Sequence, residues 1–312
     1  MKKQVQVCKH NLPKKKKHII NWHHAVCEVL KIELEPYLKY LTFHEEYHLG
    51  KSKESLRVDI LIIQKFSSLH IPKHIAEIFQ TYNLIEYKSP DDSLSIDDYY
   101  KLIGYACIFR ANTGKVNEVQ NKDITLTFLV SQFPKKLQKE LKNRNISLVK
   151  RAPGIYDISE EIFTIQLIVN RQLDETENLW LRCLDNHLME KSLYENLEKD
   201  YQIHKNEPRY SAPMNAIIWS NYQQKGEKNT MCEALYDLFA DELVERETRG
   251  ITRGKVEAIL ELLDDLGKYS EELKTYIMSE KNLNTLTYWL KLAAKADSIE
   301  DFERKSGIQR SA

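Results

Sequence analysis

Two strongly apolar runs, each holding one acidic side chain, constrain this chain more than any other feature. Residues 57–63 read Arg-Val-Asp-Ile-Leu-Ile-Ile, and residues 83–88 read Asn-Leu-Ile-Glu-Tyr-Lys. Short apolar runs rich in β-branched residues predict buried β-strands. A charge inside such a strand is costly to bury unless it is paired or bound to a metal ion. Asp59 and Glu86 are therefore candidate functional residues.

The spacing of Glu86 and Lys88 places both side chains on one side of the predicted strand. Side chains alternate faces along a strand, so Tyr87 points to the other side. If Asp59 and Glu86 converge, their carboxylates make a site for a hard cation with positions left for water and phosphate. A lysine beside them can offset charge on a phosphate in transit. This donor set is typical of metal-dependent phosphodiester cleavage.

Strands and helices are predicted to alternate through the first half of the chain. The predicted strands lie at residues 56–63, 83–88, 124–131, 145–149 and 163–170. The predicted helices lie at residues 21–41, 72–80, 95–112 and 134–143. We expect Pro36 to kink or end the first helix and Ser95 to cap the third. This order predicts an α/β fold, a mixed central β-sheet flanked by helices.

The second half of the chain shows no convincing strand after residue 175. Helices are expected at residues 175–205, 231–246, 255–266 and 283–295. Gly250 and Gly254 favour a break in the helical stretch from Met231 to Leu266, because glycine costs about 1 kcal/mol inside a helix. We therefore predict an α/β domain at residues 18–172 and a C-terminal all-helical extension at residues 173–312. The extension is expected to serve dimerisation or to clamp a substrate.

Composition excludes some classes of protein. The chain has 46 basic and 46 acidic residues, which argues mildly against a protein that coats nucleic acid. No run of 18 apolar residues predicts a transmembrane helix, and the first ten residues are too polar for a signal peptide. The five cysteines lack Cys-x-x-Cys spacing, and Cys27 and Cys107 fit buried free thiols. A cytoplasmic location is expected.

Charge is nevertheless unevenly distributed. Residues 135–151 hold seven basic side chains against the single acid Glu140. The basic residues are Lys135, Lys136, Lys139, Lys142, Arg144, Lys150 and Arg151. This segment is either a contact for phosphates or a solvated helix face.

The order of Asp59, Glu86-x-Lys88 and a capped helix resembles the PD-(D/E)XK nuclease superfamily. Together with Met231–Leu243 and the glycines after Arg249, it is similar to the recombination-promoting nuclease and transposase-like family. The resemblance covers most of the chain, but only Asp59, Glu86 and Lys88 are specific to chemistry. It implies a restriction-endonuclease-like core and a cytoplasmic Mg²⁺-dependent DNA endonuclease.

The resemblance also implies roles for individual residues. Asp59 and Glu86 are expected to bind Mg²⁺, with the main-chain carbonyl of Tyr87 as a further ligand. Lys88 is expected to position the attacking water and to stabilise charge on phosphorus. The substrate would be DNA, contacted by residues of the predicted third helix and of the basic segment. These are Lys101, Tyr105, Lys135, Lys136 and Lys139.

Two positions depart from the family pattern. Related nucleases often carry Gln-x-x-x-Tyr where this chain has Lys101 and Tyr105, so the role of that position is open. The family's first acidic position is also unassigned. Glu28 is a candidate there, with Glu33 and Glu35 as rivals.

Two other interpretations remain open. One is a catalytically decayed nuclease fold that acts as an interaction or regulatory protein. The other rests on His44-Glu-Glu-Tyr-His48, which is similar to the His-Glu-x-x-His zinc motif of metalloproteases if it forms a helix. No third ligand lies nearby in the sequence, so the protease interpretation is the weaker one.

Overall fold

The computed structural model describes residues 20–50, 56–66, 69–159, 162–188, 190–223, 248 and 250–308. The chain divides into two compact units, Met1–Glu233 and Ala234–Ala312. Each unit is described below by itself.

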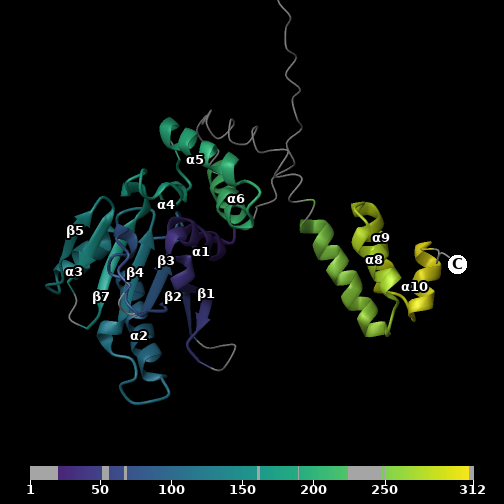
Figure 1. Ribbon diagram of the computed structural model, residues 1–312, viewed down its shortest axis with the longest axis horizontal. Helices are drawn as coiled ribbons and strands as arrows, with labels where there is room; N and C mark the ends of the chain where they lie inside the picture. Colours follow the sequence, from purple (N-terminus) through teal and green to yellow (C-terminus); the bar gives the residue numbers. More distant parts are fainter. Residues whose placement is uncertain are drawn as a thin grey trace, which may run out of the picture. The chain divides into compact units, whose positions relative to one another are not determined.

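A seven-stranded mixed sheet with the order β1-β2-β3-β4-β7-β6-β5 forms the centre of the first unit (Figure 1). The strands are β1 (Leu41–His48), β2 (Arg57–Gln64), β3 (Tyr82–Tyr87), β4 (Ile124–Val130), β5 (Leu148–Ala152), β6 (Ile155–Ile158) and β7 (Thr164–Val169). β3, β4 and β7 run parallel in the middle, and the outer pairs are antiparallel. All of β4 and nearly all of β3 and β7 are buried, as expected for parallel strands covered on both faces. The α/β class with a mixed sheet is confirmed.

Helices cover both faces of the sheet. The main core joins α2 (Ile96–Ala111) and α3 (Lys135–Lys142) to strand residues such as Leu84, Phe128 and Leu167. α1 (Trp22–Glu33) lies on the opposite face, where Trp22 packs against Tyr87 with ring centroids 6.2 Å apart. The predicted cap and break are both present. Ser95 and Asp98 form a reciprocal capping box on α2, and α1 ends before Pro36 in the 3₁₀ turn η1 (Glu35–Tyr40).

Three further helices belong to the first unit. They are α4 (Leu179–Cys183), α5 (Lys191–His204) and α6 (Pro208–Gln223). α4 and α6 both contact α1, so the expected division between residues 172 and 173 separates elements that pack together. The remaining short turns are η2 (His74–Ala76), η3 (Asn121–Asp123) and η4 (Asn170–Gln172).

The second unit is entirely helical where it is described. It contains a helix over residues 250–266, α8 (Glu271–Ser279), α9 (Leu283–Ala293) and α10 (Ile299–Ser306). Its own core includes Ile259, Leu263, Trp289 and Phe302. The helix passes through Gly254, so the expected break at that glycine is wrong. The expected helix at residues 231–246 lies outside the described residues.

Burial and helix length bear on two smaller expectations. Cys27 is buried as expected, whereas Cys107 is exposed on α2. Over the described ranges, no helix is both long and apolar enough to cross a lipid bilayer.

Candidate active site

Asp59 lies where the pairing of β2 with both neighbouring strands is interrupted. The pairing with β3 ends at Ile60 and Ile85, and the pairing with β1 passes over Asp59 and Glu46. Glu46 has φ 45°, a conformation uncommon outside glycine and a source of local strain. The Asp59 carboxylate then replaces a backbone acceptor, because its Oδ2 accepts the Tyr87 N–H at 2.9 Å. The break in pairing turns this carboxylate toward the end of β3.

Glu86 is the most deeply buried member of the site, with 2% of its surface exposed. Its Oε1 accepts hydrogen bonds from the Nζ atoms of Lys88 at 3.1 Å and Lys101 at 2.9 Å. Its Oε2 is buried and has no hydrogen-bond partner among the described residues. A buried carboxylate oxygen without a donor costs free energy unless a cation or water completes its coordination.

Lys88 connects the end of β3 to the start of α2. Its Nζ lies 2.8 Å from Asp98 and 3.1 Å from Glu86. Asp98 also accepts the backbone N–H of Ser95. The capping box of α2 therefore fixes the carboxylate that pairs with Lys88. The backbone N–H of Lys88 donates to the Leu129 carbonyl of β4, which continues the parallel ladder. Local capping and sheet pairing therefore fix Lys88 beside Glu86.

Lys101 and His23 bring two further nitrogen groups to the carboxylates. Lys101 is one turn beyond Asp98 on α2, and its Nζ lies 5.3 Å from the centre of the Tyr105 ring. Tyr105 therefore borders the site through Lys101. His23, at the start of α1, places Nε2 3.8 Å from Asp59 Oδ1 and Nδ1 3.4 Å from Glu46.

The site shifts the acidity of its members. Burial raises the pKa of the Asp59 carboxyl, and the negative charge of Glu86 raises it further. The Tyr87 N–H, His23 and Lys101 lower this pKa, but the two raising effects outweigh them. Asp59 therefore lies close enough to Glu86 to respond to its charge. Burial alone would lower the pKa of Lys88 and Lys101, but their bonds to carboxylates outweigh it and leave both above the ordinary value. Both lysines are cations at neutral pH.

The other predicted site residues lie outside this cluster. The Tyr87 side chain packs against Trp22 of α1, on the side of β3 opposite Glu86, and the alternation of side chains predicted that opposite side. The role of the Tyr87 carbonyl stays a prediction. Lys135, Lys136 and Lys139 are exposed on α3, on the same face of the sheet as α2, without a described contact to Asp59 or Glu86. Arg144, just beyond α3, bonds to Glu140 and to Tyr100 of α2, so the basic segment reaches α2 at that point.

None of the three candidates for an extra acid contacts Asp59 or Glu86. Glu28 pairs with Lys31 at 2.6 Å, and Glu35 pairs with Arg209 at 3.1 Å. Glu33 is buried and accepts the N–H groups of Trp180 and Leu181 at the start of α4.

The metalloprotease interpretation fails on secondary structure. His44 and His48 lie in strand β1, whereas the zinc motif needs them one turn apart on a helix. His44 packs its ring against Tyr47 instead.

His23 and Asp98 are not among the residues that the sequence pattern assigns to the site. Spacing along the chain gives no signal for either, since each reaches the carboxylates from a different element.

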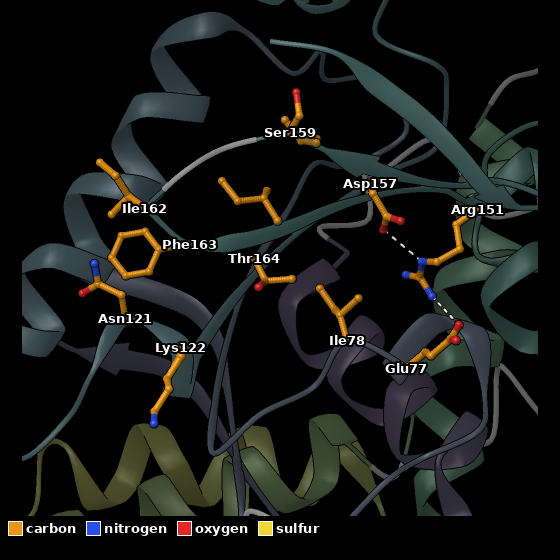
Figure 2. Close-up of a pocket in the computed structure, with 12 residues that line it drawn as sticks. Glu77, Ile78, Asn121, Lys122, Arg151, Asp157, Ser159, Ile162, Phe163 and Thr164 are labelled. Carbon is orange, nitrogen blue, oxygen red and sulfur yellow. Dashed lines mark hydrogen bonds and ion pairs between the residues drawn. The ribbon is translucent and has the colours of Figure 1, made fainter.

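One pocket of the first unit lies elsewhere. It has a volume of about 730 Å³ and is lined by residues just before β4, at the start of β7, and on β5 and β6. β3, β4 and β7 run parallel, so all three strands begin at the same end of the sheet. Glu86 lies near the C-terminal end of β3, at the opposite end of the sheet from the pocket. Figure 2 shows Arg151 in this pocket, paired with Glu77 at 2.6 Å and Asp157 at 2.9 Å. Both ion pairs join residues of the pocket wall to one another. We therefore assign no function to this pocket.

No protein-family model, curated protein or solved structure matches this chain.

Proposed function

We propose that this protein is a metal-dependent DNA endonuclease whose site is formed by Asp59, Glu86 and Lys88. The observation that carries the proposal is the pair of carboxylates at the interrupted end of the β2–β3 ladder, next to a lysine held by Asp98. The order of these residues also resembles the PD-(D/E)XK nucleases and the recombination-promoting nuclease and transposase-like proteins among them. That resemblance is what supplies DNA as the substrate.

The donor atoms fit a magnesium ion. Mg²⁺ takes oxygen ligands, often one or two carboxylates, with water and phosphate in the other positions. Among the described residues, Glu86 Oε2 has no hydrogen-bond partner, and His23 Nε2 lies 3.8 Å from Asp59 Oδ1. Bound Mg²⁺ supplies a Lewis acid and a water of lowered pKa. The Tyr87 carbonyl remains part of the proposed ligand set.

The residues of the chain have distinct roles in the proposed reaction. Lys88, held as a cation, orients the attacking water and stabilises charge that develops on the phosphate. Asp98 keeps Lys88 in place. Lys101 and Tyr105 are within reach of a phosphate that enters above Glu86. Lys135, Lys136 and Lys139 would contact phosphates further along a duplex, since backbone contacts position nucleic acid without reading its sequence.

A second function has one specific observation in its favour. Lys101 already neutralises Glu86 from the position where related nucleases often carry glutamine. A lysine there can replace the metal ion rather than assist it. On this alternative the fold is a decayed nuclease that acts through its helices as an interaction or regulatory protein.

Cleavage of plasmid DNA with Mg²⁺, and with EDTA as the control, tests the proposal. Lys88→Ala should lower the Mg²⁺-dependent rate by roughly 10²–10³-fold, the usual loss when one group that stabilises the transition state is removed. Lys115→Ala removes an exposed lysine from the loop after α2 and should leave the rate unchanged. Circular dichroism of both variants checks folding. A wild-type protein with neither Mg²⁺-dependent cleavage nor a Mg²⁺-dependent rise in melting temperature would support the second function instead.

A further inference from the structure

A second cluster of metal-binding side chains lies between α1 and β1. His24 and Glu28 are four residues apart on α1 and share one face of that helix. Glu45 faces them from β1. One donor atom from each of the three side chains lies within 4.8 Å of the others. The nuclease proposal uses none of these residues.

We propose that His24, Glu28 and Glu45 bind a divalent transition-metal ion of the Zn²⁺ type, separate from the Asp59 and Glu86 site. One imidazole and two carboxylates are common ligands of zinc in proteins, whereas Mg²⁺ prefers oxygen alone. Three protein ligands leave a position open for water or another molecule.

The distance between His24 and Glu45 fits a shared ion. His24 Nδ1 lies 3.1 Å from both carboxylate oxygens of Glu45. Atoms bound to one zinc ion at about 2.0–2.2 Å lie roughly 3.0–3.5 Å from each other in a tetrahedral or octahedral shell. The ion would replace the contact between His24 and Glu45, with neutral imidazole as the ligand.

Glu28 keeps one oxygen available. Lys31 Nζ donates to Oε1 of Glu28 at 2.6 Å, and within the described part of the chain no contact to Oε2 competes with a cation there. Glu28 and Glu45 both interact with a single lysine, Lys31. With neutral His24, these groups together carry one uncompensated negative charge. A divalent ion relieves that excess more effectively than the pairing with Lys31 alone.

Cys27 supports Glu45 from inside the protein. It lies on α1 between the two helical ligands, is fully buried, and donates its thiol hydrogen to Glu45. A donor behind a carboxylate ligand orients it toward the metal, as outer-shell groups do in known metal sites. An ion held here would fix the first turns of α1 against β1.

Zinc binding by calorimetry tests this site in the full chain. All variants carry Asp59→Asn and are measured with excess Mg²⁺, so the first site does not contribute. Adding His24→Ala, or Glu45→Gln, should remove one bound zinc ion or weaken it by about tenfold or more. His44→Ala is the matched control, a histidine of β1 that contacts Tyr47 and no carboxylate shown by the structure. It should leave zinc binding unchanged.

Cobalt substitution gives an independent readout. Co²⁺ bound by His24 should show visible absorption that is lost in the His24→Ala and Glu45→Gln variants and kept in His44→Ala. Equal zinc stoichiometry and affinity in the His24→Ala and His44→Ala proteins would overturn the proposal and leave an ion-pair cluster. Equal weakening in both would overturn it too, since the imidazoles would then act unspecifically. Neither result depends on nuclease activity.

Discussion

At the scale of single residues, the position of Lys101 decides how the proposed site works. Lys101 and Lys88 share one oxygen of Glu86, and both are protonated at neutral pH. A metal ion bound to Glu86 has to compete with the cation already there. Lys101 is the more exposed of the two lysines and is tied to no second carboxylate by a described ion pair. It is therefore the one that can move aside.

Replacing Lys101 by glutamine should raise the affinity for Mg²⁺. An ion pair with one half-exposed partner contributes about 1 kcal/mol, so the Mg²⁺ concentration for half-maximal cleavage should fall about fivefold. Mg²⁺ titration of the cleavage rate measures this, and the rate at saturating Mg²⁺ reports separately on any catalytic role of Lys101. An unchanged Mg²⁺ dependence would show that Lys101 does not compete with the metal.

Asp59 should make the metal-free protein less stable as pH rises. Its pKa in the folded state is raised by burial and by Glu86, so the protonated form favours folding. That stabilisation is complete below the ordinary pKa of 3.8 and is lost as pH rises through the raised value. Asp59→Asn keeps an acceptor for the Tyr87 N–H but carries no charge.

The measurement is melting temperature in EDTA across a pH series. The Asp59→Asn protein should melt higher than the wild type at neutral pH, and the difference should shrink as pH falls toward 3.8. A difference that is constant with pH would mean that charge at Asp59 is not its cause.

At the scale of elements, one buried acid attaches α1 to α4. Glu33 Oε1 accepts the N–H groups of Trp180 and Leu181 at 2.9 and 3.1 Å, which satisfies two free donors at the start of α4. Its Oε2 pairs with Lys73 at 2.5 Å. Glu33 therefore joins the end of α1, the segment before β3 and the first turn of α4 in a single contact.

Glu33→Ala should lower the free energy of unfolding of the first unit by about 3–5 kcal/mol, because it leaves two buried N–H groups without a partner and removes the carboxylate that pairs with Lys73. Of the contacts that the structure describes, Lys73 keeps only its hydrogen bond to the backbone carbonyl of residue 33. Glu35→Ala, two residues later, removes only an exposed pair with Arg209 and should cost no more than about 1 kcal/mol. Urea unfolding of the two variants compares them directly. Equal losses of unfolding free energy in the two variants would show that the burial of the Glu33–Lys73 pair does not matter.

At the scale of the whole molecule, the chain consists of two units with separate cores. The first is built on the sheet, and the second packs its helices around Trp289, Ile259 and Phe302. Separate cores predict separate unfolding transitions, because cooperativity follows shared packing.

Trp289→Ala should therefore lower the midpoint temperature of one calorimetric transition and leave that of the other unchanged. Loss of a buried tryptophan costs about 3–5 kcal/mol, enough to unfold a small helical unit. Glu33→Ala should act on the other transition only. A single transition that both variants shift together would contradict two independent units.

Local sequence determined much of the framework. β2, β3, β4 and β7 are predicted by apolar, β-branched runs, and the start of α2 by Ser95 with two acids behind it. These features act between residues near in sequence, so they can be read without knowing the fold. β1 and β6 were not predicted. In β1 only Leu41 is buried, and β6 has four residues, so neither shows an apolar run.

Tertiary structure overrode local preference where packing outweighs it. Gly254 lies inside a helix although glycine costs about 1 kcal/mol there, because Val256, Ile259 and Leu263 bury the same helix in the second core. α4 and α6 likewise pack on α1, although they lie beyond the boundary at residues 172–173 that the end of the strand pattern suggested.

The sequence by itself determined which residue types could make a metal site, since an acid within an apolar strand needs a partner. Only the tertiary structure decided which partners they meet. Asp59 receives the Tyr87 N–H, Glu86 receives both lysines, and Glu45 joins His24 across α1 and β1. These contacts depend on strand order, on the interruption at Asp59 and on the helix that covers each face. None of these is a property of residues that are neighbours in the chain.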